Sequence, residues 1–572
     1  MSIQVDNRQI EAHEGETILS ALRRNGVEVP TLCHMDGMAP TGACRLCVVE
    51  VEGFGGLVPS CSYPVAEGMK IKSRSPRVLD ARRTVVQLLL SNHPDDCLYC
   101  SRAAKCELQE LASELGISER LYSGEKSTRT KDVSSPSLVR DPDKCILCGR
   151  CVRVCEEIQS VSAIDFMNRG SKSFVGTVFD CGLNVSSCIN CGQCVVVCPT
   201  GALSERFEID DVLAAIADPD KFVVVQHAPA ISVTLAEEFD MKPGTDVNGK
   251  MVAALRRVGF DRVFDTSFSA DLTIMEEGSE LVQRLTSGGV LPMFTSCSPG
   301  WIKFVETFYP EFMPNLSTCK SPQQMMGALI KTFYAERQGI SPENIVSVSI
   351  MPCTAKKFEA RRGEMGRGQL QDLDYVLTTR ELGALLRRCG VNIEKMESDT
   401  ADTPLGERTT AGKIFGASGG VMEAAARTAH FLVTGRELDK LEIKPLRGLE
   451  GIKQASLDID GTQVNIAVVS GLGNARALLE EVRSGRQDLH FVEVMTCPGG
   501  CIAGGGQPLN ADLDAVRARM KALYKIDRDG PVKTSHSNVA VKKLYDEFLG
   551  KPLGHKSHEL LHTSYEGREV IK

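Results

Sequence analysis

The chain has 572 residues, of which 42% are hydrophobic, so its length and composition allow packed cores in roughly four domains. Its formal net charge is −8 and it has no long basic block, which argues against a nucleic-acid-binding protein. No apolar run approaches membrane-spanning length, and the first residues lack the features of an export signal. We therefore expect a cytoplasmic protein.

Cysteine usage narrows the class of protein further. The 22 cysteines gather in runs with CxxC spacing, in a long chain without an export signal. Disulfides are rare in a reducing compartment, whereas clustered cysteines at such spacings are typical metal ligands. The sequence therefore predicts metal clusters rather than a disulfide framework.

The first predicted unit, residues 1–78, begins like a β-grasp ferredoxin domain. Residues 2–12 alternate as a hairpin around Asp6 and Asn7, and residues 17–24 are typical of a helix that ends at Gly26. Four cysteines follow as Cx10CxxCx13C, namely Cys33, Cys44, Cys47 and Cys61. This spacing suits a [2Fe–2S] cluster, although the first gap is wider than in plant-type ferredoxins, and a structural zinc site is the alternative.

The second predicted unit, residues 79–122, carries a histidine ahead of three cysteines. The set is spaced as HxxxCxxCx5C and comprises His93, Cys97, Cys100 and Cys106. A single histidine is usually a polar surface residue, but here no fourth cysteine stands nearby to complete the set. We expect a [4Fe–4S] cluster with one histidine ligand, whose neutral charge should raise the potential of the cluster.

Residues 123–137 are rich in Ser, Thr and Lys and are typical of a linker. The third predicted unit, residues 138–208, then repeats the run CxxCxxCxxxC, which is the pattern of bacterial two-cluster ferredoxins, in which the fourth cysteine of each run ligates the other cluster. One predicted ligand set is Cys145, Cys148, Cys151 and Cys198, and the other is Cys188, Cys191, Cys194 and Cys155. Cys181, Cys319 and Cys389 match no ligand set and are interpreted as ordinary thiols.

Residues 218–525 alternate between strand and helix patterns, which predicts a two-lobed α/β domain. We expect strands at 221–226, 262–265 and 291–294 in one lobe and at 346–351, 465–470 and 490–495 in the other, with helices such as 419–429 between them. Three of these strands release cysteines at their carboxyl ends, in TSCSPGW (295–301), MPCTAKKFE (351–359) and EVMTCPGGCIAGGGQP (493–508). Open α/β sheets bind ligands at that edge, so the three loops should share one cleft. The last CxxxC alone would fit a redox pair or two buried thiols equally well.

The second and third of these segments closely resemble two signatures of [FeFe]-hydrogenases, and TSCSPGW resembles the first signature, usually TSCCPxW. The whole chain is similar to the long form of that family, which carries accessory clusters. The spacing around His93 resembles the histidine-ligated [4Fe–4S] site that these hydrogenases share with a large peripheral subunit of respiratory complex I. The last predicted unit, residues 526–572, is similar to the hydrogenase small subunit. The resemblance implies a multidomain fold, α+β in the ferredoxin-like units and α/β in the catalytic domain.

The resemblance also implies a catalytic H-cluster, a [4Fe–4S] cubane joined by cysteine sulfur to a di-iron unit with carbonyl, cyanide and dithiolate ligands. Cys353, Cys497 and Cys501 match its cubane ligands, with Cys501 matching the bridging one. Lys356 matches the cation that donates to a cyanide ligand. Other residues match the surrounding pocket: Ala228, Pro229, Gln323, Met351 and Met495.

TSCSPGW departs from the family motif at one position. In the usual motif the second cysteine ligates the cubane and the first relays protons. The register from Pro299 and Trp301 puts Cys297 at the relay position and leaves Ser298 where a thiolate is expected. A hydroxyl is a poorer iron ligand because its pKa is far higher, so a shifted loop with Cys297 on the cubane is the alternative. The variant resembles that of catalytic subunits of NAD(P)-linked, multi-subunit hydrogenases.

A candidate proton route lies on a predicted helix. Glu277, Glu280 and Arg284 are spaced at i, i+3 and i+7, so they line one helix face, as the residues of an ordinary solvated charged face also would. The surrounding DLTIMEEGSELVQR (271–284) matches the family's proton-channel helix, and Ser317 matches its hydroxyl member. The resemblance therefore implies that these side chains carry protons to the catalytic site.

The resemblance implies reversible hydrogen activation, with one [2Fe–2S] and three accessory [4Fe–4S] clusters. Electrons would pass to ferredoxin or to a flavin- and NAD(P)-binding partner subunit, because no dinucleotide fingerprint is apparent in this sequence. Dedicated maturation proteins would supply the di-iron unit. A non-catalytic electron-transfer or hydrogen-sensing protein is the alternative. Near the C-terminus, His555, His558 and His562 share a helix face and could bind a metal or belong to a surface helix.

Overall fold

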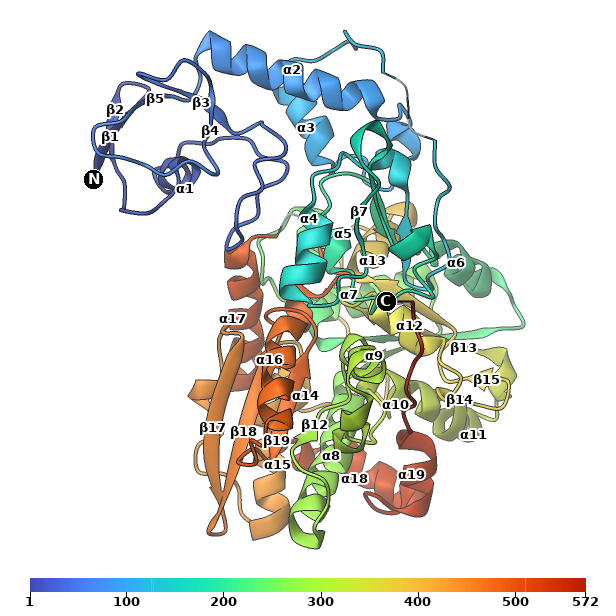
Figure 1. Ribbon diagram of the computed structural model, residues 1–572. Helices are drawn as coiled ribbons and strands as arrows, with labels where there is room; N and C mark the ends of the chain where they lie inside the picture. Colours follow the sequence, from blue (N-terminus) through green and yellow to red (C-terminus); the bar gives the residue numbers. More distant parts are fainter. Residues whose placement is uncertain (125, 127, 510, 572) are drawn as a thin grey trace.

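The computed structural model describes residues 1–124, 126, 128–509 and 511–571. The predicted linker 123–137 lies partly outside the described residues, at positions 125 and 127. Figure 1 shows the small N-terminal domains at one end of the molecule and a larger α/β body at the other. Within the described part, no helix is both long enough and apolar enough to cross a bilayer.

The N-terminal domain is a five-stranded sheet in the order β2-β1-β5-β3-β4 with helix α1 packed against it. The predicted hairpin is confirmed, and Asp6 and Asn7 turn the chain with φ angles of 44° and 69°. The predicted helix is confirmed as well, because the Thr17 side chain caps it by accepting a hydrogen bond from the Ser20 amide. The elements are β1 (Ser2–Val5), β2 (Arg8–Glu11), α1 (Ile18–Arg24), β3 (Val48–Val51), β4 (Val58–Pro59) and β5 (Lys70–Lys72).

Two helices, α2 (Pro76–Asn92) and α3 (Glu107–Glu114), pack on each other and lead into a small domain that shows the internal duplication. Gly149 and Gly192 occupy equivalent places in the two cysteine runs, and both adopt positive φ, at 76° and 70°. Each glycine precedes a short helix, and the two helices pack together. The elements are β6 (Leu138–Arg140), α4 (Arg150–Arg153), β7 (Asp165–Met167), β8 (Phe174–Gly176), α5 (Gln193–Val197) and β9 (Leu203–Glu205).

Two four-stranded sheets form the α/β body. The first, in the order β11-β10-β13-β16, is wholly parallel and consists of β10 (Phe222–His227), β11 (Arg262–Asp265), β13 (Ile345–Met351) and β16 (Tyr375–Thr378). The second, in the order β12-β19-β18-β17, consists of β12 (Met293–Phe294), β17 (Ile452–Ile459), β18 (Thr462–Ser470) and β19 (Phe491–Met495), and β17 is its antiparallel edge. The predicted strands therefore exist, and the expectation of two lobes holds.

The predicted assignment of strands to lobes was wrong for two of them. The strand expected at 291–294 pairs with β19 in the second sheet, and the strand expected at 346–351 pairs with β10 in the first. The cause is α8 (Ser267–Ser287), whose 21 residues span about 31 Å and carry the chain from the edge strand β11 to the other sheet. Chain order therefore does not follow sheet membership.

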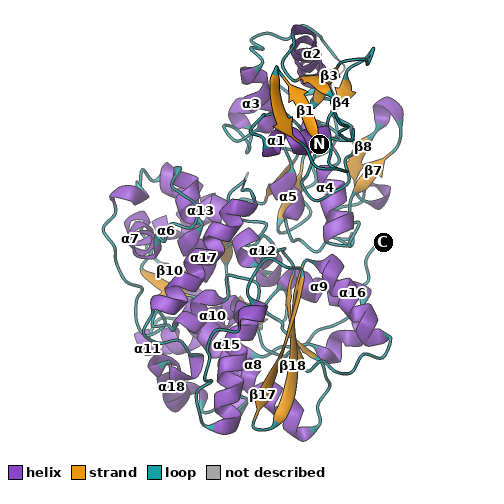
Figure 2. Ribbon diagram, turned by 90° about the vertical axis from the view of Figure 1, so that its left-hand side faces the viewer, coloured by secondary structure: helices purple, strands orange, loops and turns teal. Residues whose placement is uncertain are grey.

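Helices fill the space between and around the two sheets. Figure 2 shows α8, α10 (Pro322–Leu329) and α15 (Gly420–Thr434) between β10 on one side and β17 and β18 on the other. Helix α8 packs against α10, α14 (Thr410–Ile414) and α15. The helix expected at 419–429 is confirmed as α15 and extends five residues further. The remaining elements are α6 (Ile209–Ala217), α7 (Asn248–Val258), α9 (Pro299–Phe308), α10 (Pro322–Leu329), α11 (Ala335–Gln338), α12 (Ala355–Ala360), β14 (Gly366–Arg367), β15 (Leu370–Gln371), α13 (Thr379–Arg388), α14 (Thr410–Ile414), α15 (Gly420–Thr434), α16 (Leu472–Arg483), α17 (Leu513–Asp529), α18 (Val539–Leu544) and α19 (His555–Leu561).

The duplicated cysteine domain packs directly on the α/β body through two glycines. A Cβ atom on Gly505 would lie 2.1 Å from the Cys191 carbonyl oxygen and 2.8 Å from Gly192 Cα. A Cβ atom on Gly192 would lie 2.4 Å from Thr354 Oγ1, and the same hydroxyl donates to the Asn190 carbonyl at 2.7 Å. Only residues without side chains permit this approach. The second cysteine run therefore lies against the loops that follow β13 and β19.

Candidate functional site

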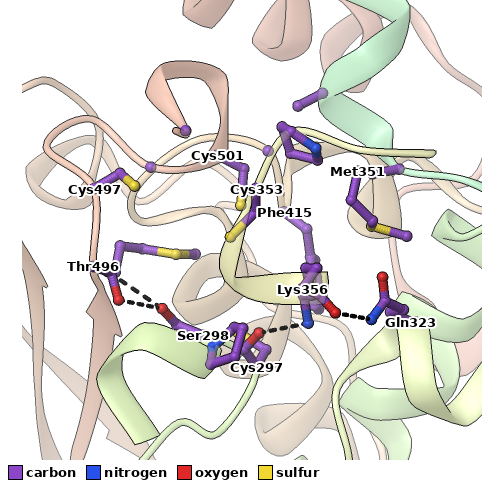
Figure 3. A pocket seen from close by; sticks show the side chains of 18 of the residues that line it. Cys297, Ser298, Gln323, Met351, Cys353, Lys356, Phe415, Thr496, Cys497 and Cys501 are labelled. Atoms are coloured by element: carbon purple, nitrogen blue, oxygen red, sulfur yellow. Dashed lines mark hydrogen bonds between the residues drawn. The ribbon is translucent and has the colours of Figure 1, made fainter. Parts of the chain in front are cut away.

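The carboxyl ends of both sheets meet around one buried cavity. It is bounded by the loops that follow β10, β12, β13 and β19. Figure 3 shows the cysteines of three of these loops gathered around it. Every residue predicted for the catalytic pocket lines this cavity: Ala228, Pro229, Cys297, Ser298, Gln323, Met351, Cys353, Lys356, Met495, Cys497 and Cys501. The predicted common cleft is therefore present.

Three thiols from two lobes point into surroundings that disfavour their ionisation. Burial raises the pKa of Cys353 and Cys497 above the usual thiol value, and it raises that of Cys501 to about 12. Thiolates ligate iron, so a soft, positively charged group in the cavity would favour the ionised form of these thiols. The donor set of the cavity thus fits an iron–sulfur centre.

Cys297 and Ser298 turn toward different parts of the cavity. Ser298 Oγ lies 2.8 Å from Thr496 Oγ1 and accepts a hydrogen bond of 3.3 Å from the Thr496 amide (Figure 3). Burial and the nearby Glu277 carboxyl raise the pKa of Cys297 well above its usual value. Ser298 therefore lies on the side of Cys497, the residue that follows Thr496, and Cys297 lies in electrostatic range of Glu277.

A buried lysine reaches the same cavity from α12. Lys356 Nζ donates to the Cys297 carbonyl at 3.1 Å and to Glu359 Oε2 at 2.9 Å. Gln323 Nε2 donates to the same Glu359 oxygen at 3.0 Å, and Gln323 Oε1 accepts from the Ser349 hydroxyl at 2.8 Å. An ammonium group is thus held at the cavity wall by a paired carboxylate, which offsets the cost of burying its charge.

The predicted proton-route residues lie in a row on α8 and on the segments before and after α9. Ser317 Oγ donates to Glu280 Oε2 at 2.8 Å, and Arg284 Nη2 donates to Glu280 Oε1 at 2.6 Å. Glu277 is fully buried beside the Ser317 hydroxyl and the Ser296 amide, and neither makes a well-formed hydrogen bond with its carboxyl. The row runs from Cys297 inside the molecule to the partly exposed Arg284.

The duplicated domain brings its cysteines together in the two predicted sets. The first set, Cys145, Cys148, Cys151 and Cys198, lines one small pocket. In the second set, the Cys194 thiol lies in electrostatic range of the thiols of Cys155, Cys188 and Cys191, and burial raises the pKa of all four. Each fourth cysteine therefore lies with the partners from the other run, as the spacing predicts.

The N-terminal cysteines form two close pairs. The thiols of Cys33 and Cys44 share a hydrogen bond that lowers the pKa of Cys33, and the thiols of Cys47 and Cys61 share another that lowers the pKa of Cys47. A tetrahedral zinc site would need all four sulfurs within about 4 Å of one another. Among the described residues, no three of these thiols come within 4.8 Å. Two pairs suit two irons, which favours the [2Fe–2S] interpretation.

The histidine-containing set lies at the surface. Cys97 is exposed, whereas burial lowers the pKa of His93 and raises that of Cys106. Cys100 lies in electrostatic range of Cys106 and of Lys144, and Lys144 is also a charged neighbour of His93. The four predicted ligands thus lie in one region, next to the first set of the duplicated domain, because a Cβ on Gly201 would meet Cys100 Sγ at 2.5 Å.

Two contributors to the site were missed by the sequence analysis. Gln193 Nε2 donates to Cys497 Sγ at 3.1 Å and to the Ala503 carbonyl at 3.1 Å, so α5 contacts the catalytic cavity. Thr496 fixes Ser298, as described above. Their positions inside the motifs, between Cys191 and Cys194 and directly before Cys497, were the available signal.

The metal site considered for three C-terminal histidines does not form. His555 and His558 are exposed and His562 is buried, although the rings of His558 and His562 stack with centroids 4.6 Å apart. Among the described residues, the group of three potential ligands that does come within 4.8 Å joins His562 to Glu280 and Cys319 instead. The helical periodicity placed the histidines on one face, but it did not specify that His562 follows the last turn of α19 and points inward.

Comparisons with known proteins agree with this arrangement. Residues 221–505 match the family "Iron only hydrogenase large subunit, C-terminal domain", and residues 513–568 match "Iron hydrogenase small subunit". The N-terminal part matches a 2Fe-2S iron-sulfur cluster binding domain (1–76), an iron-sulfur binding region of NADH-ubiquinone oxidoreductase-G (82–120) and a 4Fe-4S dicluster domain (123–202).

Relatives of similar length share this organisation. The chain is 47% identical to NADP-reducing hydrogenase subunit HndD of Solidesulfovibrio fructosivorans, over 100% of both chains. It is 41% identical to Iron hydrogenase 1 of Clostridium pasteurianum, over 99% of this chain and 100% of that one. The solved structure of apo [FeFe]-hydrogenase HydA1 from Chlamydomonas reinhardtii superposes with a TM-score of 0.58 at 41% identity, over 64% of this chain and 100% of that one.

Glu277 should make the stability of the protein depend on pH. Burial raises the pKa of Glu277 from its ordinary 4.5 to about 8, with the Glu280 carboxylate as the second cause. The folded state then binds this proton more tightly, so its contribution to stability is full below pH 4.5 and is lost as pH rises through 8. Glu277→Gln should abolish this loss, which amounts to about 1.4 kcal/mol per pH unit.

Anaerobic thermal unfolding of the cluster-loaded protein between pH 5 and 8 measures the difference. The midpoint of Glu277→Gln should fall less than that of the wild type as pH rises, and exposed Glu336→Gln is the matched control. Equal pH slopes in the wild type and Glu277→Gln would contradict the assignment.

Proposed function

Because the chain belongs to the iron-only, or [FeFe], hydrogenases, we propose that it interconverts hydrogen with protons and electrons, 2H⁺ + 2e⁻ ⇌ H₂, in the cavity between its two sheets. The observation that carries the proposal is the convergence of Cys353, Cys497 and Cys501 with a buried ammonium on one enclosed space. When bound there, an H-cluster would supply the iron at which hydrogen is split or formed. The remaining chemistry belongs to the side chains around it.

The proposed cubane ligands are Cys353, Cys497 and Cys501, with Ser298 at the fourth position. Lys356 would donate from the cavity wall to an anionic ligand of the di-iron unit, since Glu359 holds its ammonium in place. Apolar and amide side chains would enclose the unit and exclude water: Ala228, Pro229, Gln323, Met351 and Met495. Exclusion of water strengthens each electrostatic contact inside the cavity.

Protons would travel along the row of Cys297, Glu277, Ser317, Glu280 and Arg284. Glu277 suits a relay because its pKa of about 8 lies near neutral pH, where a carboxyl can both take up and release a proton. The Ser317 hydroxyl can pass a proton to Glu280, to which it already donates a hydrogen bond. We assign the relay role to Cys297, because the loop keeps the register of the family motif and the thiol lies near Glu277.

Electrons would travel through one [2Fe–2S] and three accessory [4Fe–4S] clusters. Gln193 joins the last cysteine set to the cavity through its hydrogen bond to Cys497, so the row of clusters would end next to the cubane. The relative HndD is named as a subunit of an NADP-reducing hydrogenase. We therefore propose a flavin- and NAD(P)-binding partner subunit, or ferredoxin, as the electron partner, with the reaction in the reducing cytoplasm.

The protein loaded with all clusters and matured with its di-iron unit should exchange hydrogen isotopes between D₂ and water. Glu277→Gln should lower this exchange by roughly 10²- to 10⁴-fold, the usual contribution of a positioned proton-transfer group. Mass spectrometry of the gas phase makes the measurement. Added NADP⁺ should stay oxidised until a partner subunit is supplied. Matured protein without isotope exchange would point to a non-catalytic electron carrier or sensor, and NADP⁺ reduction by this chain alone would contradict the partner proposal.

Cys297 and Ser298 can be separated by two substitutions. Cys297→Ala should keep the iron content and the cubane signal while exchange activity collapses, because a relay acts only during turnover. Ser298→Cys should give the cubane a fourth thiolate and shift its reduction potential. Iron analysis and electron paramagnetic resonance measure both variants. Loss of the cubane in Cys297→Ala would instead make Cys297 a ligand, and an intact cubane with undiminished exchange would contradict both assignments.

A further inference from the structure

A buried group of side chains with metal-binding chemistry includes Glu280, the outer carboxylate of the proposed proton route. In the described part of the chain, Glu280, Cys319 and His562 are the one trio whose ligand atoms all lie within 4.8 Å of each other. The Cys319 thiol lies 3.9 Å from Glu280 Oε2, and all three side chains are buried. None of the predicted cluster sets includes Cys319 or His562.

Backbone contacts hold the three residues in place although they come from distant parts of the chain. Glu280 is on α8, Cys319 precedes α10, and His562 directly follows α19. Cys319 and His562 form an isolated β-bridge, flanked by hydrogen bonds from the Lys320 amide to the Leu561 carbonyl (2.7 Å) and from the Thr563 amide to the Thr318 carbonyl (2.8 Å). The C-terminal segment is thereby joined to the segment that carries Ser317.

His562 is oriented in the way that metal-bound histidines are. Its Nε2 lies 3.1 Å from Glu276 Oε2, and its Nδ1 lies 2.8 Å from the Thr318 hydroxyl. A carboxylate behind one imidazole nitrogen fixes the tautomer in which the other nitrogen offers its lone pair, which is the usual arrangement behind a zinc-bound histidine. That lone pair faces the Thr318 hydroxyl, whose oxygen lies 3.5 Å from Glu280 Oε2, so this hydroxyl has to rotate away when an ion binds between Nδ1 and Glu280.

The Glu276 carboxylate, which supports His562, is itself held in position by hydrogen bonds. Glu276 Oε2 accepts a hydrogen bond of 2.8 Å from the Leu553 amide, and Glu276 Oε1 accepts from the hydroxyls of Tyr545 and Ser557. All three donors belong to the C-terminal segment around α18 and α19. A carboxylate held by three donors keeps its position whether or not an ion is bound, so the orientation of His562 exists before binding.

The donor set selects the class of cation. A thiolate, an imidazole and a carboxylate together suit Zn²⁺, whereas Mg²⁺ and Ca²⁺ prefer oxygen ligands alone. Tetrahedral zinc would bring these donors to about 3.3 to 3.8 Å from one another, so the observed sulfur–oxygen distance of 3.9 Å needs little change. Burial, followed by the charges of Glu280, Glu277 and Glu276, raises the pKa of Cys319, so binding would release its proton.

We propose that Glu280, Cys319 and His562 bind a zinc-class divalent cation, and that the bound ion blocks proton transfer through Glu280. Glu280 cannot ligate the ion and relay protons at the same time, because a carboxylate oxygen that ligates zinc no longer accepts the Ser317 proton. The binding of the ion is independent of the proposed hydrogenase activity. Its inhibitory effect rests on that proposed function.

Zinc titration of the matured, cluster-loaded protein tests the inhibition. Zn²⁺ should suppress isotope exchange and hydrogen uptake with a viologen acceptor, and a chelator should restore both. Cys319→Ala should raise the half-inhibitory zinc concentration by at least about tenfold, in line with the loss of a ligand or its support. The exposed thiol variant Cys389→Ala is the matched control and should behave as the wild type. Unchanged iron content and cubane signals show that each variant is folded and loaded.

Zinc-edge X-ray absorption tests the site itself, independently of activity. The wild type should show one sulfur at about 2.3 Å with nitrogen and oxygen neighbours near 2.0 Å, and Cys319→Ser should lose the sulfur. Zinc without a sulfur ligand, or equal inhibition of the wild type and Cys319→Ala, would overturn the assigned site. A sulfur-bound zinc that leaves exchange unchanged would overturn the inhibition and the proton row through Glu280, while leaving the binding site intact.

Discussion

The burial of ionisable groups around one cavity is the constraint on which the rest of the structure depends. Cys353, Cys497 and Cys501 meet there only because two sheets direct their carboxyl ends at each other. Removing a charge from water costs several kcal/mol unless a partner compensates it. Lys356 has such a partner in Glu359, whereas burial leaves the thiols protonated until a metal centre supplies positive charge.

The burial of the site also bears on how the duplicated cysteine domain packs on the α/β body. The proposed electron transfer into a buried centre would require close contact, and Gly192 and Gly505 let two backbones approach each other there. Gln193 then reaches the Cys497 sulfur, and hydrogen bonds to cluster sulfurs are one of the means by which proteins set reduction potentials. In Figure 2, α5 lies in the upper part of the molecule, whereas α8, which carries the buried Glu277 and Glu280, lies in the lower part. Proposed electron and proton routes thus enter the cavity from different directions.

Much of this could be predicted from the sequence because the signals are local. Runs of β-branched residues located β10, β13 and β19 to within one or two residues, and the spacing of the cysteines from Cys145 to Cys198 indicated which of them lie close together. The sheet to which β12 and β13 belong could not be predicted, because it depends on the direction in which α8 leads the chain from one sheet to the other. The Ser298–Thr496 contact and the inward turn of His562 also join residues far apart in sequence, and no local pattern specifies such contacts.

The central claim is that the three cysteine loops hold an iron centre in the cavity between the sheets. Anomalous X-ray diffraction at the iron absorption edge, on crystals of the matured protein, tests it directly. The account predicts a cluster of iron atoms bounded by Cys353, Cys497, Cys501 and Ser298, with further iron extending toward Lys356 and Cys297. Iron confined to the N-terminal cysteine sets, with none between the two sheets, would contradict it.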